Sequence, residues 1–77
     1  MVNSVKFYQT DERRLQMSKI KDYRIKNNYT QRYVAYKLGV SQQAVGKWET
    51  GENSPSIKHL ITLSAIFGCR IEELIKN

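Results

Sequence analysis

Apolar residues recur three or four positions apart through most of this chain, which is the spacing of one face of an α-helix. Extended structure is indicated only over the short segment 5–8. A first helix begins at Thr10 or at Ser18, because either hydroxyl can cap a helix N-terminus. It ends near Asn27 and Asn28, because asparagine tolerates the left-handed conformation that closes many helices. The pattern predicts an all-α fold.

The middle of the chain predicts two helices separated by a tight turn. Thr30 is a good N-cap for a helix over residues 31–38, and Gly39 follows where positive φ costs glycine nothing. Ser41 then caps a helix over residues 42–50. Two helices joined by a glycine-containing turn of three or four residues form a helix-turn-helix unit.

The helix over residues 42–50 has two chemically different faces. Helical spacing places Val45, Trp48 and Glu49 on one side. The opposite side carries Gln42, Gln43, Gly46 and Lys47. We expect the first face to pack into the core and the second to face a ligand.

Two further helices are predicted in the C-terminal third. The fourth begins after a cap at Ser54 or Ser56, has Pro55 near its first turn, and runs to Phe67. Its expected buried residues are Ile57, Leu60, Ile61, Ser64 and Phe67. A short fifth helix covers residues 70–76, with acids early and a lysine late.

The positive charge of the chain is unevenly distributed. The total is +6, from 13 Lys and Arg against seven Asp and Glu. Residues 1–47 carry ten basic and three acidic side chains, a net +7, whereas residues 48–77 carry three and four, a net −1. This asymmetry favours a polyanion on one side and a protein contact on the other, although a general excess of solubilising charge is the alternative.

Several classes of function fit the sequence poorly. A chain of 77 residues buries a small core, and no apolar run approaches the roughly 20 residues that cross a bilayer. The N-terminus lacks the apolar stretch of a signal peptide, and the single cysteine fits a reducing compartment, so we expect a cytoplasmic protein. His59 and Cys69 have no partners at zinc spacing, and no nucleophile-base pair or phosphate loop is evident. We expect no enzyme, metal, cofactor or small-molecule ligand.

At its helix-turn-helix residues the chain resembles the Cro and phage-repressor family, often called the xenobiotic-response-element family. The resemblance covers roughly residues 20–75. It rests on the following segments: Thr30-Gln31, Leu38-Gly39-Val40-Ser41, Trp48-Glu49-x-Gly51, Pro55-Ser56-Ile57 and Phe67-Gly68-Cys69. It implies a compact five-helix, lambda-repressor-like domain over residues 18–77. Residues 1–17 would form an extension or arm, or would lengthen the first helix.

The resemblance implies that the third helix lies in the major groove of double-stranded DNA. Gln42, Gln43 and Lys47 would then read base edges, since glutamine pairs with adenine and lysine donates to guanine. Ala44 is a candidate for contact with a thymine methyl group. Gln31 would bind phosphate or brace Gln42.

The remaining implied roles concern phosphate, packing and departures from the family pattern. Candidate phosphate contacts are Arg32, Lys37, Thr50 and Asn53. Arg24 is implied to pair with Glu49 and so tie the first helix to the third. Two positions depart from the family pattern: Gly46 stands where the family usually has serine or a similar polar residue, and Glu52 stands where it usually has lysine or arginine. The glycine either lets the helix backbone approach DNA closely or is neutral drift, and the acid weakens the phosphate-contact role of its loop.

The leading hypothesis is a homodimeric transcriptional regulator that binds an inverted repeat. Dimer contacts are expected from the near-neutral C-terminal half, through Phe67, Ile71, Leu74 and Ile75. The alternative is a protein-interaction module, such as an antitoxin, in which DNA binding is secondary. The five tyrosines are expected to pack against helices more than to stack on bases, and Tyr33 and Tyr36 could touch phosphates.

Overall fold

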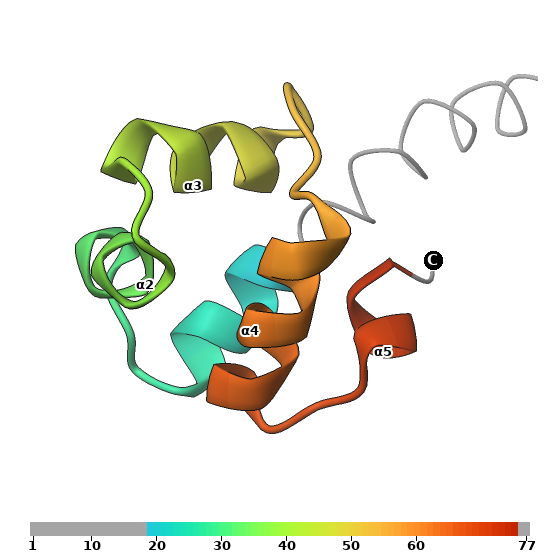
Figure 1. Ribbon diagram of the computed structural model, residues 1–77. Helices are drawn as coiled ribbons and strands as arrows, with labels where there is room; N and C mark the ends of the chain where they lie inside the picture. Colours follow the sequence, from blue (N-terminus) through green and yellow to red (C-terminus); the bar gives the residue numbers. More distant parts are fainter. Residues whose placement is uncertain (1–18, 76–77) are drawn as a thin grey trace, which may run out of the picture.

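The computed structural model describes residues 19–75, and all of the regular structure in that range is helical (Figure 1). A first helical segment covers residues 19–26. It is followed by α2 (Gln31–Leu38), α3 (Gln42–Thr50), α4 (Ile57–Phe67) and α5 (Ile71–Ile75). Over residues 19–75, the predicted all-α, five-helix architecture is confirmed. Over the described residues, no helix combines the length and the apolar composition that a membrane crossing needs.

Some expectations fall on residues outside the described range. These are the extension over residues 1–17, the extended segment 5–8, the two possible helix starts at Thr10 and Ser18, and the end of the fifth helix at Lys76.

Side-chain caps define the starts of α2, α3 and α4. The Thr30 hydroxyl accepts a hydrogen bond from the Tyr33 backbone N–H at 3.0 Å. The Ser41 hydroxyl accepts from the Ala44 N–H at 3.1 Å. At α4 the cap is Ser56, not Ser54, and its hydroxyl accepts from the third residue of the helix. Each cap satisfies an N–H group that has no partner within the helix.

The turn between α2 and α3 depends on one glycine. Gly39 ends α2 in the left-handed conformation, with φ 69°, which a residue with a side chain adopts at a cost. The Val40 N–H then donates to the Ala35 carbonyl at 3.0 Å, which closes the end of the helix. Figure 1 shows the result: α3 leaves α2 at a steep angle and lies on the side of the domain away from α5.

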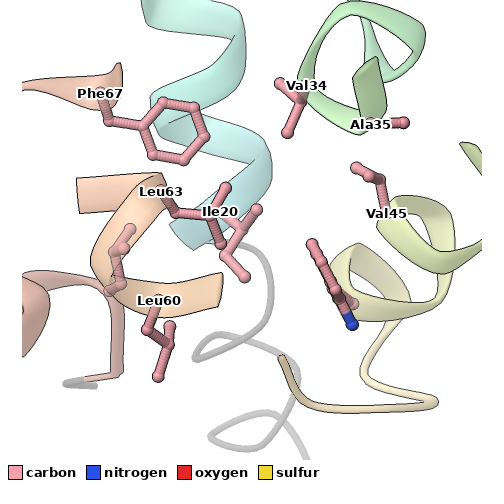
Figure 2. Packing of buried hydrophobic residues seen from close by; sticks show 9 residues of the cluster. Ile20, Val34, Ala35, Val45, Leu60, Leu63 and Phe67 are labelled. Carbon is pink, nitrogen blue, oxygen red and sulfur yellow. The ribbon is translucent and has the colours of Figure 1, made fainter. Parts of the chain in front are cut away.

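The core joins residues from every helix in the described range (Figure 2). Its fully buried side chains are Ile20, Val34, Val45, Leu63 and Leu74. Trp48 and Phe67 extend the cluster on either side. With so few buried residues, each one carries a large share of the apolar contact that holds the domain together.

The buried face of α4 differs from the expectation. Ile57 and Ile61, which we expected in the core, are 65% and 54% exposed, while Leu63 is completely buried. Ser64 is half-buried and its hydroxyl bonds to the Ile61 carbonyl. The helix carries large apolar residues on most of its circumference, so its sequence pattern alone did not identify the face that packs.

Two of the four residues expected at a dimer interface belong to the core instead. Phe67 is 5% exposed and Leu74 is 1% exposed. Phe67 stacks on Tyr23, with ring centroids 6.0 Å apart. Their side chains therefore pack within one chain, whereas Ile71 is half-buried and Ile75 is exposed.

Glu73 fastens α5 to the first helix. Its carboxylate accepts hydrogen bonds from the Arg70 backbone N–H at 3.3 Å and from the Tyr23 hydroxyl at 3.1 Å. These bonds stabilise the charged form, so the backbone donor first and then Tyr23 hold the pKa of Glu73 below its ordinary value.

Replacing Leu63 should test the reassigned face of α4. We expect Leu63→Ala to lower the free energy of unfolding by about 2–5 kcal/mol, because it removes buried contacts and leaves a cavity. Ile61→Ala, two residues away and half exposed, should cost much less. Urea denaturation of both variants measures the difference, and equal losses would contradict the assignment.

Acid should weaken the attachment of α5. A carboxyl whose pKa is lowered on folding adds stability above its unfolded pKa, about 4.3 for Glu, and loses it as the pH falls through the folded value. Glu73→Gln should therefore make the fall in thermal midpoint below about pH 4.3 less steep. Glu72→Gln, which removes an exposed carboxylate 3.9 Å from Arg70, is the control. A parent-like acid slope in Glu73→Gln would refute the role of this bond.

Candidate nucleic-acid interface

α3 separates buried from exposed residues as its sequence pattern predicts. Val45, Trp48 and Glu49 are all at most 8% exposed and fix the helix to the domain. Gln42, Gln43 and Lys47 are exposed on the outer face. Ser41 caps the N-terminus of the helix, and the outer face stays open to a ligand because its side chains are exposed.

The outer face of α3 borders an open hollow of about 430 Å³. The hollow is lined by Gln31, Gln42, Gln43, Gly46, Lys47, Thr50 and Glu52. It brings together the three expected base readers with two of the expected phosphate contacts. Its lining residues include one lysine and a single acid, Glu52, which is contributed by the loop that follows α3.

Other expected DNA contacts lie outside this hollow. Arg32 and Lys37 are exposed on α2, and Asn53 is exposed after α3. Ala44 is half-buried and packs partly against the core. The structure therefore gathers some of the expected contacts around the hollow and leaves Arg32, Lys37 and Asn53 exposed outside its lining.

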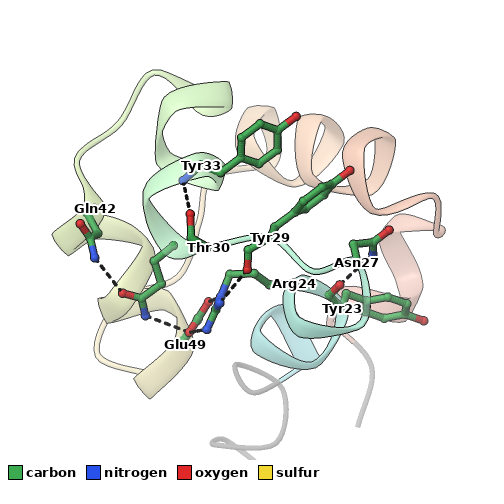
Figure 3. A network of polar contacts seen from close by, with 9 residues as sticks. Tyr23, Arg24, Asn27, Tyr29, Thr30, Tyr33, Gln42 and Glu49 are labelled. Carbon is green, nitrogen blue, oxygen red and sulfur yellow. Dashed lines mark hydrogen bonds and ion pairs between the residues drawn. The ribbon is translucent and has the colours of Figure 1, made fainter.

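A buried ion pair connects the first helix to α3 (Figure 3). Arg24 Nε donates to Glu49 Oε2 at 2.6 Å, and the two side chains are 13% and 4% exposed. Arg24 also donates to the Tyr29 carbonyl at 2.9 Å. The structure contains the pair that the family resemblance implied. Because both side chains are largely removed from water, losing either one would leave the other charge uncompensated.

The same carboxylate also holds Gln31. Gln31 Nε2 donates to Glu49 Oε1 at 3.0 Å, a contact that sequence analysis did not anticipate. A carboxylate only accepts hydrogen bonds, so Gln31 must present its amide nitrogen to Glu49 and its oxygen elsewhere. That oxygen accepts from Gln42 Nε2 at 3.5 Å, which is the bracing contact considered as an alternative for Gln31.

This chain of bonds sets which atoms Gln42 offers outward. Because one Gln42 N–H points to Gln31, its carbonyl oxygen and second N–H stay available on the exposed side. One acceptor beside one donor matches the N6 and N7 edge of adenine in the major groove. The buried charge of Glu49 thereby orients an amide on the surface through one intermediate side chain.

The remaining candidates are tyrosines, the cysteine and the groups that could bind a metal ion. Tyr29 donates its hydroxyl to the Ile66 carbonyl at 3.2 Å, and Tyr36 is 79% exposed on α2. Burial raises the pKa of the Cys69 thiol, which keeps it protonated beside the core. Across residues 19–75, no three His, Cys, Asp or Glu side chains gather closely enough to hold a metal ion.

Comparison with known protein families finds one that covers most of the described structure. The helix-turn-helix family profile matches residues 20–74. This span begins in the first helix and ends in α5, and so includes the core, the buried ion pair and the hollow. No solved structure gives a significant match to the chain.

Curated relatives carry similar segments in proteins of different length. An uncharacterized HTH-type transcriptional regulator of Methanocaldococcus jannaschii is 40% identical over 57 residues, covering 74% of this chain and 86% of that protein. The HTH-type transcriptional activator BcrR of Enterococcus faecalis is 37% identical over 77% of this chain but only 29% of its own length. The HTH-type transcriptional regulator DicA of Escherichia coli is 42% identical over 61% of this chain and 36% of its own length.

Removing Glu49 should be far more damaging than removing an exposed ion-pair partner. Glu49→Ala leaves Arg24 buried without its charge partner, and we expect a loss of about 3–5 kcal/mol in unfolding free energy. Arg70→Ala breaks an exposed contact and should change stability little. The double variant Arg24→Met with Glu49→Leu should recover much of the loss in chemical denaturation. A double variant no more stable than Glu49→Ala would contradict the pairing argument.

Proposed function

This chain belongs to the helix-turn-helix family of transcriptional regulators, and from that premise we propose that it is a cytoplasmic homodimer that binds a specific inverted repeat in double-stranded DNA. The observation that carries the proposal is the outer face of α3. Its exposed glutamines and lysine surround one hollow while its opposite face is locked into the core. A helix held in this way can enter a major groove as a rigid reader.

Base recognition is assigned to the centre of this surface. Gln42 offers a preset donor and acceptor to adenine, and Gln43 and Lys47 extend the readout along the same helix. Ala44 stays a candidate for a thymine methyl at the edge of the contact. Thr50 in the lining of the hollow, and the exposed Arg32, Lys37 and Asn53 outside it, would position the domain through phosphates without reading sequence.

The dimer is assigned to the other half of the domain. α5 lies on the side of α4 away from α3, so a second copy bound there would leave both reading helices free (Figure 1). Ile75 is 47% exposed and Ile71 is half-buried, which leaves apolar surface for such a contact. Two domains so joined would present their α3 helices to half-sites about one helical turn apart, roughly 34–36 Å. The inverted repeat follows from that symmetry.

The test uses the tightest duplex that the parent protein selects from a random DNA library. Gln43→Ala and Lys47→Ala should each weaken binding to this duplex by about 1–3 kcal/mol, the range for one lost base contact. Lys58→Ala removes an equal charge from α4, outside the hollow, and is the matched control. Fluorescence anisotropy over a salt series should show affinity falling by about 0.9 log units per log unit of salt for each phosphate neutralised.

The same measurements separate this proposal from the alternative of a protein-interaction module. If Gln43→Ala and Lys47→Ala bind the selected duplex as tightly as the parent, α3 is not the reader. A salt-independent affinity would contradict the proposed phosphate contacts and, with them, DNA binding by this surface.

A further inference from the structure

Gly46 lies in the middle of α3, where a glycine weakens the helix. Glycine is about 0.8–1 kcal/mol less favourable than alanine at an interior helical position. The backbone gives no reason for it, because the glycines with positive φ are Gly39, Gly51 and Gly68. Gly46 has ordinary helical geometry that any residue can adopt.

Packing does not require a glycine at this position either. A Cβ atom built on Gly46 would meet only the Gln31 side chain, with its nearest atoms 3.8 and 3.9 Å away. Both distances are ordinary van der Waals contacts. The domain could therefore hold an alanine here without displacing a neighbour, so neither the backbone nor the packing accounts for the glycine.

The position lies among the base readers. Gly46 follows Gln42 by four residues and Gln43 by three, so it shares their face of the helix, and it lines the same hollow. Its own backbone N–H and C=O are committed within α3. The nearby Gln31 amide is bonded to Glu49 on one side and Gln42 on the other. Gly46 itself therefore offers only hydrogens on carbon to the hollow, beside the Gln31 amide nitrogen and oxygen, which lie 3.8 and 3.9 Å from the position of a Cβ.

We propose that Gly46 is a specificity-determining position whose missing side chain makes room for the C5-methyl group of a thymine. The proposal rests on the proposed function, because it requires α3 to lie in the major groove. Thymine is the base that presents an apolar group there, and the Cα hydrogens of Gly46 give that group an apolar contact. An added Cβ would occupy the space of the methyl and hold the helix away from the base.

The experiment combines Gly46→Ala with removal of single methyl groups from DNA. The probe is the duplex selected by the parent, with each thymine replaced in turn by uracil. One replacement should weaken parent binding about fourfold, the factor for one buried methyl group. Gly46→Ala should bind the unmodified duplex roughly tenfold more weakly, as for one lost base contact, and that same replacement should partly restore its binding, because removal of the methyl makes room for the Cβ.

Two controls make the result decisive. Ala65→Ser also adds one heavy atom to a helix, on an exposed position of α4, and should keep parent affinity and uracil sensitivity. Gly46→Ala should unfold at a higher temperature than the parent, because alanine favours the helix, so weaker binding cannot result from unfolding.

Failure of this inference is distinct from failure of the proposed function. If Gly46→Ala keeps parent affinity while Gln43→Ala and Lys47→Ala weaken it, Gly46 does not determine base specificity, but α3 keeps its role as the reading helix. If no uracil replacement affects the parent, the methyl-binding role is wrong. If all three variants bind like the parent, the reading helix is wrong as well.

Discussion

The buried carboxylate of Glu49 is the interaction on which the rest of the structure depends. It neutralises Arg24, which arrives from the first helix, and it accepts a hydrogen bond from Gln31 at the start of α2. Three helices thereby meet at one charge that is almost removed from water. Such a charge is tolerated only when its partners are in place, so it fixes the relative position of these helices more strictly than apolar packing alone.

The orientation of the polar side chains on α3 depends on the buried Glu49 carboxylate. Gln31 and Gln42 follow Glu49 in one line of hydrogen bonds that ends in the hollow on α3. Val45 and Trp48 fix the buried side of α3 in the core. Neither the position of this helix nor the orientation of the Gln42 amide therefore has to change when a ligand binds. Preorganisation of this kind lowers the entropy that binding must otherwise overcome.

Local features of the fold followed from the sequence, whereas features set by tertiary contact did not. The caps at Thr30 and Ser41 and the turn at Gly39 involve residues close in the chain, so residue types alone predicted them. The packed face of α4 was predicted only in part, because Ile61 and Leu63 are equally apolar and only the neighbouring helices distinguish them. The bond from Gln31 to Glu49 spans 18 residues and had no local signal, while the contact of Arg24 with Glu49 came from family resemblance. The functions of the exposed residues stay predictions.

The free space beside Gly46 has an evolutionary consequence. A change at Glu49 alters stability and surface amide orientation together, so selection acts on both properties at once. Position 46 touches no buried group and its neighbour lies at ordinary contact distance. An alanine there would leave the folded state intact while it adds a side-chain atom at the centre of the exposed helix. The domain thus contains one site at which descendants can diversify their ligand preference without first acquiring compensatory stabilising mutations.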